Sequence, residues 1–301
     1  YLEAREAAGD DVYQNIRQVA WFQFAIQAPD QLRQRVAFAL SEILVVSDQS
    51  GAIEGEPIPM AQYYDLLVDG AFGNYRNLLE QVTLSPVMGH YLSMFKNRKP
   101  DPEENIRPDE NYAREVMQLF SIGLVKLDEA GHSNGEATYL PADVSGLAKV
   151  FTGWSWHCPD WPNNDCFTRG SVAGVSDRDK AFKPMLGYPQ YHSAEDKQFL
   201  DARLPGQEMP DPLASLKGAM DALSAHPNVG PFIGRQLIQR LVTSNPTPAH
   251  VTAVSRAFAN NGQGVRGDMK AVIKAVLLHP DARVVSDQAG KVREPVLRLS
   301  A

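Results

Sequence analysis

The densest group of polar side chains in the chain is the run Asp109–Glu115. If this run is helical, Glu110 and Arg114 lie four residues apart on one face, as do Asn111 and Glu115. Two carboxylates beside a guanidinium group can bind a cation, orient a polar substrate or act as an acid–base pair. The same pattern also suits an ion-paired first helical turn, because the helix dipole favours acidic side chains there. The catalytic candidates are therefore Glu110, Asn111, Arg114 and Glu115, with a structural role weighted above a functional one.

Two histidines in the second half of the chain are candidates for the same site. His192 follows a tyrosine in an acidic stretch, and His226 precedes a proline at the end of a predicted helix. An enzyme whose site lies between two helical halves would bring either histidine to Glu110 and Glu115. That arrangement predicts a concave pocket in which these groups converge.

Three tryptophans, Trp154, Trp156 and Trp161, lie close together in the sequence. If they are exposed, they form a stacking surface for a glycan or a protein partner. If they are buried, they are the core of a loop-rich region, which is the more common arrangement. They are the candidate partner- or substrate-binding residues, together with His192 and His226.

The two cysteines, Cys158 and Cys166, are separated by seven residues that include two prolines. A disulfide would close this loop and stabilise the fold by roughly 2–3 kcal/mol. Free thiols, or a metal site completed by His157 and Asp160, are the alternatives, although zinc-binding cysteine pairs usually have two to four intervening residues. The disulfide is favoured, and it indicates an oxidising compartment.

Other potential metal ligands have weaker patterns. His192 is followed by Glu195 and Asp196, and hard oxygen ligands suited to Ca²⁺ recur at Asp160, Asp165, Asp177 and Asp179. The regular spacing of an EF-hand is missing, and a loop histidine near acidic residues is usually solvated. No metal or cofactor is therefore assigned from the sequence.

Helical periodicity dominates the segments that must position these residues. Apolar residues recur at helical spacing after predicted starts at Asp30, Pro59, Asn74, Pro86, Asp109 and Pro141, and again after Asp211, Pro248 and Asp268. Glycines at positions 70, 123 and 153 end three of these helices. Strand-like alternation of useful length is absent, so the sequence predicts an all-α protein.

The segment 154–210 differs, because it is rich in Pro, Gly, Asp and aromatic residues and lacks sustained periodicity. A long irregular segment of this kind is usually a functional or covering element. We therefore expect one integrated domain with three parts: an N-terminal helical half (1–153), an irregular insertion closed by the disulfide (154–210) and a C-terminal helical half (211–301).

Composition excludes several functional classes. The 301 residues carry a net charge of −7, with 44% hydrophobic and 22% charged residues. This acidic balance argues against a general nucleic-acid binder, which needs a basic face. The longest apolar runs are too short to span a bilayer, and the first residue is Tyr1 rather than Met, so a mature or trimmed fragment is expected.

The run Glu110–Gly123 resembles the signature of the family called domain of unknown function 1800. Asp143-Val144, the run Phe151–Trp154 and the His-Pro helix beginning at His226 are similar to further motifs of that family. The stretch from His192 through Lys197 to Gly206, and the run Lys291–Val296, are similar more loosely. Many members carry His where this chain has Phe120, so a metal-binding role at that position does not apply here.

The resemblance implies an exported bacterial protein, periplasmic or extracellular, often encoded beside a sulfatase- or phosphatase-like protein. It implies no mechanism. The first hypothesis is an extracytoplasmic scaffold or binding protein that acts with a partner, such as that neighbour, or assembles with itself. The second is an enzyme, a hydrolase or an oxidoreductase, with a carboxylate-based or metal-assisted site.

Overall fold

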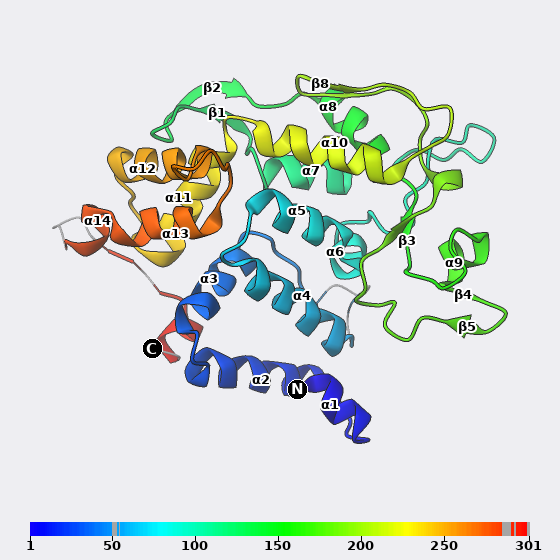
Figure 1. The fold of residues 1–301 in the computed structure, drawn as a ribbon, viewed down its shortest axis with the longest axis horizontal. Coiled ribbons are helices and arrows are strands. Elements are labelled where there is room, and N and C mark those ends of the chain that lie inside the picture. The colour runs from blue at the N-terminus through cyan, green and yellow to red at the C-terminus, as the bar shows by residue number, and fades with distance from the viewer. Residues whose placement is uncertain (50–52, 54, 285–289, 292, 300–301) are drawn as a thin grey trace.

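A computed structural model describes residues 1–49, 53, 55–284, 290–291 and 293–299. Helices surround a central core, with the two ends of the chain near the same side of the molecule (Figure 1). None of the helices described in these ranges is long and apolar enough to cross a membrane. Of the run Lys291–Val296, Val292 lies outside the described residues.

The described residues of the first part of the chain form six helices. They are α1 (Leu2–Ala7), α2 (Gln14–Gln27), α3 (Gln31–Ser41), α4 (Pro57–Gly70), α5 (Tyr75–Leu84) and α6 (Pro86–Tyr91). Asn74 is the N-cap of α5 as predicted, and its side chain accepts a hydrogen bond from the Arg76 backbone N–H at 3.0 Å. Helix α4 begins at Pro57, two residues before the predicted start.

The polar motif begins a short helix, α7 (Asn111–Gln118), which ends five residues before Gly123. A hairpin of β1 (Val125–Leu127) and β2 (Ser133–Ala137) follows. Helix α8 (Pro141–Ala148) and the 3-10 turn η1 (Lys149–Phe151) come next. Gly123 has a φ of +73°, a left-handed conformation that suits glycine and reverses the chain after α7.

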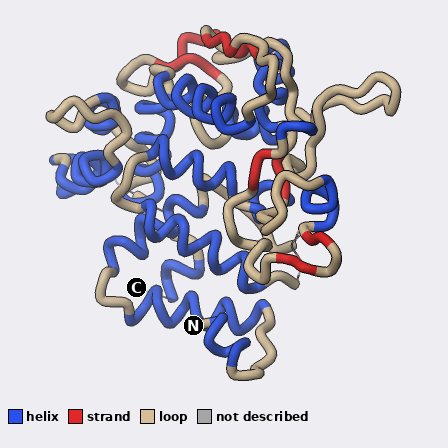
Figure 2. Tube along the Cα trace, turned by 45° about the vertical axis from the view of Figure 1, so that its right-hand side comes forward, coloured by secondary structure: helices blue, strands red, loops and turns tan. Residues whose placement is uncertain are grey.

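The insertion is built from small hairpins, turns and one short helix, and short strands among long loops lie beside the helices in Figure 2. Its elements are β3 (Trp154–Ser155), α9 (Asn164–Arg169), β4 (Ser171–Val172), β5 (Val175–Ser176), β6 (Leu186–Gly187), η2 (Pro189–Tyr191), β7 (Lys197–Phe199) and β8 (Ala202–Leu204). β3 pairs with β6, β4 with β5 and β7 with β8, each pair antiparallel.

The expectation of an all-α fold is wrong. The chain is about 51% helical, and its described residues also form eight strands in four two-stranded antiparallel sheets, which makes the fold mixed. The strands escape detection because each is only two to five residues long. The longest, β2, is exposed at all five positions, so it has no alternation between buried and exposed residues.

The last part of the chain is helical again. It contains α10 (Pro212–Ala225), α11 (Val229–Leu241), α12 (Pro248–Ala259), α13 (Met269–Leu278), α14 (Pro280–Arg283) and α15 (Pro295–Leu299). Asp211 and Asp268 are N-caps, and each accepts a hydrogen bond from a backbone N–H three residues later. Helices α11, α12 and α13 pack against one another at the side opposite to the insertion (Figure 1).

One core cluster draws residues from all three predicted parts. Leu40 and Tyr112 from the N-terminal part, Trp154 and Phe199 from the insertion and Leu237 from the C-terminal part are all fully buried in it. Burial of apolar surface therefore holds the insertion to both helical halves. The positions of the two boundaries between these parts stay a prediction.

Candidate functional site

Glu110 lies at the surface, where it connects two helices. Its Oε1 accepts a hydrogen bond from the Ser145 hydroxyl of α8 at 2.6 Å, and its Oε2 accepts one from the Arg114 guanidinium at 3.3 Å. The side chains of both Glu110 and Arg114 keep more than 40% of their surface exposed. An exposed pair of this kind contributes about 0.2–1 kcal/mol, so the geometry is that of a surface clamp between α7 and α8.

Glu115 is the more buried carboxylate of the motif. Burial raises its pKa, and the neighbouring Arg114 opposes this rise. In the described part of the chain its carboxylate makes no hydrogen bond or ion pair, whereas Gln118, one turn later, accepts a bond from the Tyr139 hydroxyl at 3.1 Å. Asn111 is exposed, and its backbone N–H is bound by Asp109. The four catalytic candidates thus share one helix but do not converge on a common atom.

Replacing Glu115 with glutamine is expected to change the free energy of unfolding at pH 7 by no more than about 0.5 kcal/mol, and not downwards. A carboxyl group whose folded-state pKa is raised stabilises the fold only while it is protonated, and this contribution is lost as the pH rises through that pKa. Urea unfolding at pH 7 measures the change. A loss of about 1–3 kcal/mol would instead indicate a buried hydrogen-bonded carboxylate. Glu110→Gln, which removes charge from the surface clamp, is the matched comparison.

The opposite face of α7 belongs to the core. The Tyr112 hydroxyl lies 2.6 Å from the Thr83 hydroxyl, and its ring meets the edge of Phe151 at 4.8 Å between centroids. Burial raises the pKa of Tyr112 well above its usual value. These contacts agree with the helical spacing of the buried residues of α7, which are Tyr112, Ala113, Val116 and Met117.

His192 is fully buried and does not approach the polar motif. Its Nδ1–H donates to the Thr152 carbonyl at 2.8 Å, and its Nε2 accepts from the Ser215 hydroxyl at 2.9 Å. Both nitrogens are therefore used in joining α10 to the segment after η1. The acidic residues that follow it have their own partners, since Glu195 pairs with Lys149 and Asp196 with Arg203.

His226 ends α10, and its Nδ1 accepts a hydrogen bond from the backbone N–H of Asn228 at 3.2 Å. The Asn228 side chain in turn binds the carbonyls of Ile122 and Val125 at 2.9 and 2.7 Å. This histidine thus helps to fix the chain that leaves α7. Among the described residues, neither His192 nor His226 bonds to Glu110 or Glu115.

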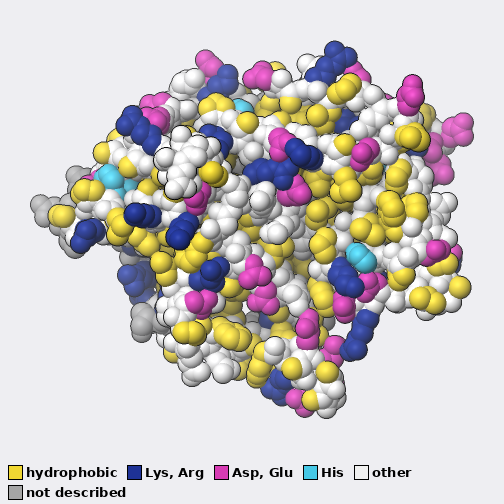
Figure 3. All heavy atoms as spheres, viewed as in Figure 1, with side chains coloured by type: hydrophobic (Ala, Val, Ile, Leu, Met, Phe, Trp, Pro, Cys, Tyr) yellow, Lys and Arg dark blue, Asp and Glu magenta, His cyan; other side chains and the backbone are white. Residues whose placement is uncertain are grey.

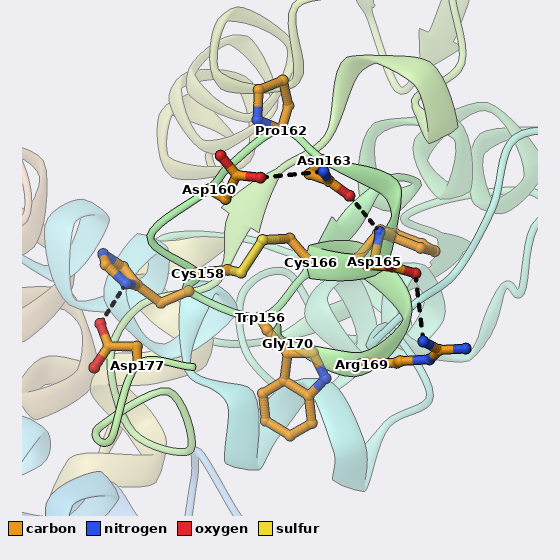
Figure 4. Close-up of a disulfide and its surroundings, with 12 residues drawn as sticks. Trp156, Cys158, Asp160, Pro162, Asn163, Asp165, Cys166, Arg169, Gly170 and Asp177 are labelled. Atoms are coloured by element: carbon orange, nitrogen blue, oxygen red, sulfur yellow. Dashed lines mark hydrogen bonds and ion pairs between the residues drawn. A yellow bond between two sulfur atoms is a disulfide. The ribbon is translucent and has the colours of Figure 1, made fainter. Parts of the chain in front are cut away.

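Cys158 and Cys166 form the predicted disulfide, with Cα atoms 5.6 Å apart (Figure 4). The bond lies against Phe167 and Tyr188 in a small core of the insertion. His157 pairs with Asp177, with Nδ1 and Oδ2 2.8 Å apart, and Asp160 accepts a hydrogen bond from Asn163. The proposed metal alternative is wrong, because the sulfurs bind each other and the two extra ligands point elsewhere.

The three tryptophans have three different environments. Trp154 is fully buried, and its indole N–H donates to the Val150 carbonyl at 3.1 Å. Trp161 is 46% exposed, and its N–H donates to the Gly187 carbonyl at 2.9 Å, which fixes the direction of its ring. Trp156 is half-buried. Only the last two can meet a ligand.

Trp156 is the centre of a group that we call the Trp156 cluster, which consists of His90, Phe95, Lys96, Trp156 and Lys180. The edge of Phe95 meets Trp156 at 4.4 Å between centroids, and His90 stacks on Phe95 at 4.0 Å. The Nζ atoms of Lys96 and Lys180 lie 5.6 and 5.3 Å from the Trp156 ring centre. Both distances are within the range of cation–π attraction.

The cations of the Trp156 cluster are close enough to affect one another. Burial, followed by the charge of Lys180, lowers the pKa of Lys96. Burial, followed by the charge of Lys96, lowers the pKa of His90. Lys180 also donates to the carbonyls of Arg169 and Gly170 at the end of α9, where Gly170 packs against Trp156 (Figure 4). The cluster is thus positively charged and partly desolvated.

The backbone of the loop after α6 directs Lys96 toward the rings. Lys96 has a φ of +61°, a left-handed conformation that is unfavourable for residues other than glycine by about 1–2 kcal/mol. Its N–H donates to the Trp154 carbonyl at 2.8 Å, which holds the loop against the insertion. Sequence reasoning missed Lys96, Phe95 and His90, because they precede Trp156 by 60 to 66 residues in the sequence and form no local motif.

Comparisons with known proteins identify one family. The sequence profile described as "Protein of unknown function (DUF1800)" matches residues 3–301, which is nearly the whole chain. No curated protein and no solved structure matches this chain.

Proposed function

The chain belongs to the DUF1800 family of proteins of unknown function, and from its own residues we propose that it is an extracytoplasmic binding protein whose Trp156 cluster holds an acidic group of the ligand. The supporting observation is a pair of lysines, Lys96 and Lys180, that converge on one half-buried tryptophan without an acidic partner. Among the described residues, neither ammonium group has a carboxylate within ion-pair distance, although both lie over the Trp156 ring.

An unpaired cationic pair of this kind favours an anion. Holding two ammonium groups close together, partly out of water, costs free energy that an acidic ligand group would offset. The aromatic rings beside them exclude water and so strengthen the attraction. Carboxylate, sulfate and phosphate groups share the chemistry that such a site would bind.

The net charge of −7 does not prevent this binding. At physiological ionic strength, charges more than about 8 Å apart are largely screened from each other. The ligand's acidic group would therefore respond mainly to the local charges at Trp156 rather than to the acidic surface elsewhere.

We choose an acidic sugar polymer as the ligand class because Trp161, elsewhere on the insertion, offers a second aromatic surface. Its ring is 46% exposed and is fixed in direction by the bond to the Gly187 carbonyl. An exposed and oriented indole provides an apolar face with a polar edge, which suits contact with a sugar ring. Hydrophobic side chains also gather on the side of the surface where the insertion lies (Figure 3).

The disulfide supports the proposed location. Disulfides persist in oxidising compartments and are rare in the cytosol, and the bond between Cys158 and Cys166 closes the loop that carries Trp161. A role for a sulfatase- or phosphatase-like neighbour, or for self-assembly, stays a prediction.

Binding measurements test the proposal directly. The chain would be titrated with a sulfated polysaccharide, with polygalacturonate and with polyglutamate, each at low and at physiological salt. We expect Lys96→Met to weaken binding of the acidic sugars about tenfold or more, because a hydrogen bond to a charged group contributes about 1.5–3 kcal/mol. Lys96→Arg keeps the charge and should retain most of the affinity.

Lys270→Met is the matched control, because Lys270 is an exposed lysine on α13, far along the chain from Trp156. It should bind as the unchanged chain does. Equal loss in Lys270→Met and Lys96→Met would indicate general charge attraction and contradict the site. Binding of polyglutamate alone would assign an acidic protein segment as the ligand instead of a sugar.

The alternative hypothesis of an enzyme has less support. Glu110 is engaged by Arg114 and Ser145 at the surface, and His192 uses both ring nitrogens in buried hydrogen bonds. An acid–base mechanism needs these groups within reach of one substrate atom.

A further inference from the structure

His250, His279 and Asp281 form a group at the junction of α12, α13 and α14, away from both the polar motif and the Trp156 cluster. One ligand atom from each residue lies within 4.8 Å of the other two. His250 lies in the first turn of α12, His279 ends α13, and Asp281 lies in the first turn of α14. Helices α14 and α9 lie at opposite sides of the molecule (Figure 1).

His250 presents an unused nitrogen. Its side chain is fully buried, and its Nε2 lies 3.0 Å from the Val276 carbonyl. A carbonyl oxygen can only accept, so Nε2 carries the proton and Nδ1 carries the lone pair. This Nδ1 is buried and has no hydrogen-bond partner among the residues that the structure describes.

A buried acceptor without a partner is costly and calls for an explanation. Metal-binding histidines usually donate their other ring N–H to a backbone carbonyl or a carboxylate, which fixes the tautomer and directs the free nitrogen at the ion. His250 has this arrangement, with Val276 in the position of the supporting carbonyl.

The other two residues lie close enough to complete such a site after one change of rotamer. The imidazoles of His250 and His279 are stacked, with centroids 4.4 Å apart and an interplanar angle of 9°. Because the lone pairs lie in the ring planes, the His279 ring has to rotate before both histidines can bind one ion. Nδ1 of His279 lies 3.7 Å from Oδ2 of Asp281. The Thr247 hydroxyl donates to the same Asp281 oxygen and so orients the carboxylate.

We propose that His250, His279 and Asp281 bind a divalent transition-metal ion, for which Zn²⁺ is the best match. Two imidazole nitrogens and a carboxylate oxygen are a ligand set that Zn²⁺ accepts, with a fourth position left for water or a ligand group. Bonds of about 2.0–2.2 Å to the metal require the donor atoms to approach one another by roughly 1 Å. The side chains of His279 and Asp281 are 16% and 37% exposed, so an ion can reach the site from solvent.

A simpler role for His279 has to be separated from metal binding. Its Nδ1 accepts a hydrogen bond from the Asp281 backbone N–H at 3.2 Å, which caps α14. His226 makes the same bond to Asn228 at the same distance, in the other His-Pro sequence of the chain. His226 has no second histidine in a described ligand group, so it is the matched control for the capping role.

The test is Zn²⁺ binding by the untagged 301-residue chain after removal of metal with a chelator. Titration with ZnCl₂ should show one ion per chain, and Co²⁺ should give the visible absorption of a low-symmetry nitrogen and oxygen site. We expect His279→Gln and Asp281→Asn each to weaken Zn²⁺ binding at least about tenfold. His226→Gln should bind Zn²⁺ as tightly as the unchanged chain.

Circular dichroism verifies that each variant is folded. If His279→Gln does not fold, Asp281→Asn alone tests Zn²⁺ binding. Asp281 is exposed, and the asparagine that replaces it still has an oxygen that can accept the Thr247 hydrogen bond. The proposal is overturned if the chain binds no stoichiometric Zn²⁺, or if the folded variants at positions 279 and 281 bind it unchanged.

Discussion

Replacing Gly146 with alanine is expected to lower the free energy of unfolding by about 3 kcal/mol or more. A Cβ atom at this position would lie 1.7 Å from the carbonyl oxygen of Gln198 and 2.7 Å from its carbonyl carbon. Both are backbone atoms of β7, so no change of side-chain rotamer relieves the overlap. Helix α8 and the β7–β8 hairpin would have to separate.

Asp143 shows why that separation is costly. Its Oδ1 accepts a hydrogen bond from the Leu200 backbone N–H at 2.6 Å, and its Oδ2 accepts one from the Leu140 N–H at 2.7 Å. One side chain therefore starts α8 and holds the turn after β7. Moving the hairpin away from Gly146 would also break its bond to Asp143.

Gly73→Ala is the control for this prediction, because the added Cβ would meet its nearest atom at 3.5 Å, an ordinary contact. Thermal and urea unfolding of both variants measures the difference. Equal stability of the two variants would show that α8 and β7 are not packed as closely as described.

The helices could be predicted because their signals are local. Asn74, Asp211 and Asp268 each cap the helix that the apolar spacing predicts, and proline begins α6, α8 and α12 where expected. Each signal depends only on residues within one or two turns. Tertiary contacts were not needed to find them.

The strands could not be predicted, because each is too short to show a period, whether its partner is near in sequence, as in β4–β5 and β7–β8, or distant, as in β3–β6. Trp154 pairs with Gly187 across more than 30 residues, and each of these strands has only two residues. A two-residue strand has no period for a sequence pattern to reveal. The all-α prediction failed for this reason.

The candidate sites also differ in whether their residues lie close together in the sequence. The polar motif is contiguous and was found, but among the described residues neither His192 nor His226 bonds to its carboxylates. The Trp156 cluster and the His250 group each join segments that are separated by about 30–90 residues, and only folding brings them together. His279 lies at the end of α13, and His250 had no signal of its own in the sequence.

Acidification is expected to destabilise the chain through His192 by up to roughly 3 kcal/mol between pH 6.5 and pH 4. Burial lowers the pKa of this histidine from 6.5 to about 4, and nearby Lys197 acts in the same direction, while the Thr152 carbonyl and Asp211 oppose it. Below pH 6.5 the unfolded chain therefore binds a proton that the folded chain does not. Stability falls as the pH decreases through this window and levels off below the folded-state pKa.

His192→Gln isolates this contribution. The variant should be less stable at pH 7 by about 1–3 kcal/mol, because the Thr152 and Ser215 hydrogen bonds are disturbed. It should also lose less stability than the unchanged chain between pH 6.5 and pH 4, because it has no imidazole to protonate. Burial also lowers the pKa of His90, His226 and His250, but these groups titrate in both proteins and cancel in the difference. Urea unfolding at several pH values gives the two curves, and parallel curves would mean that His192 is not held neutral in the folded core.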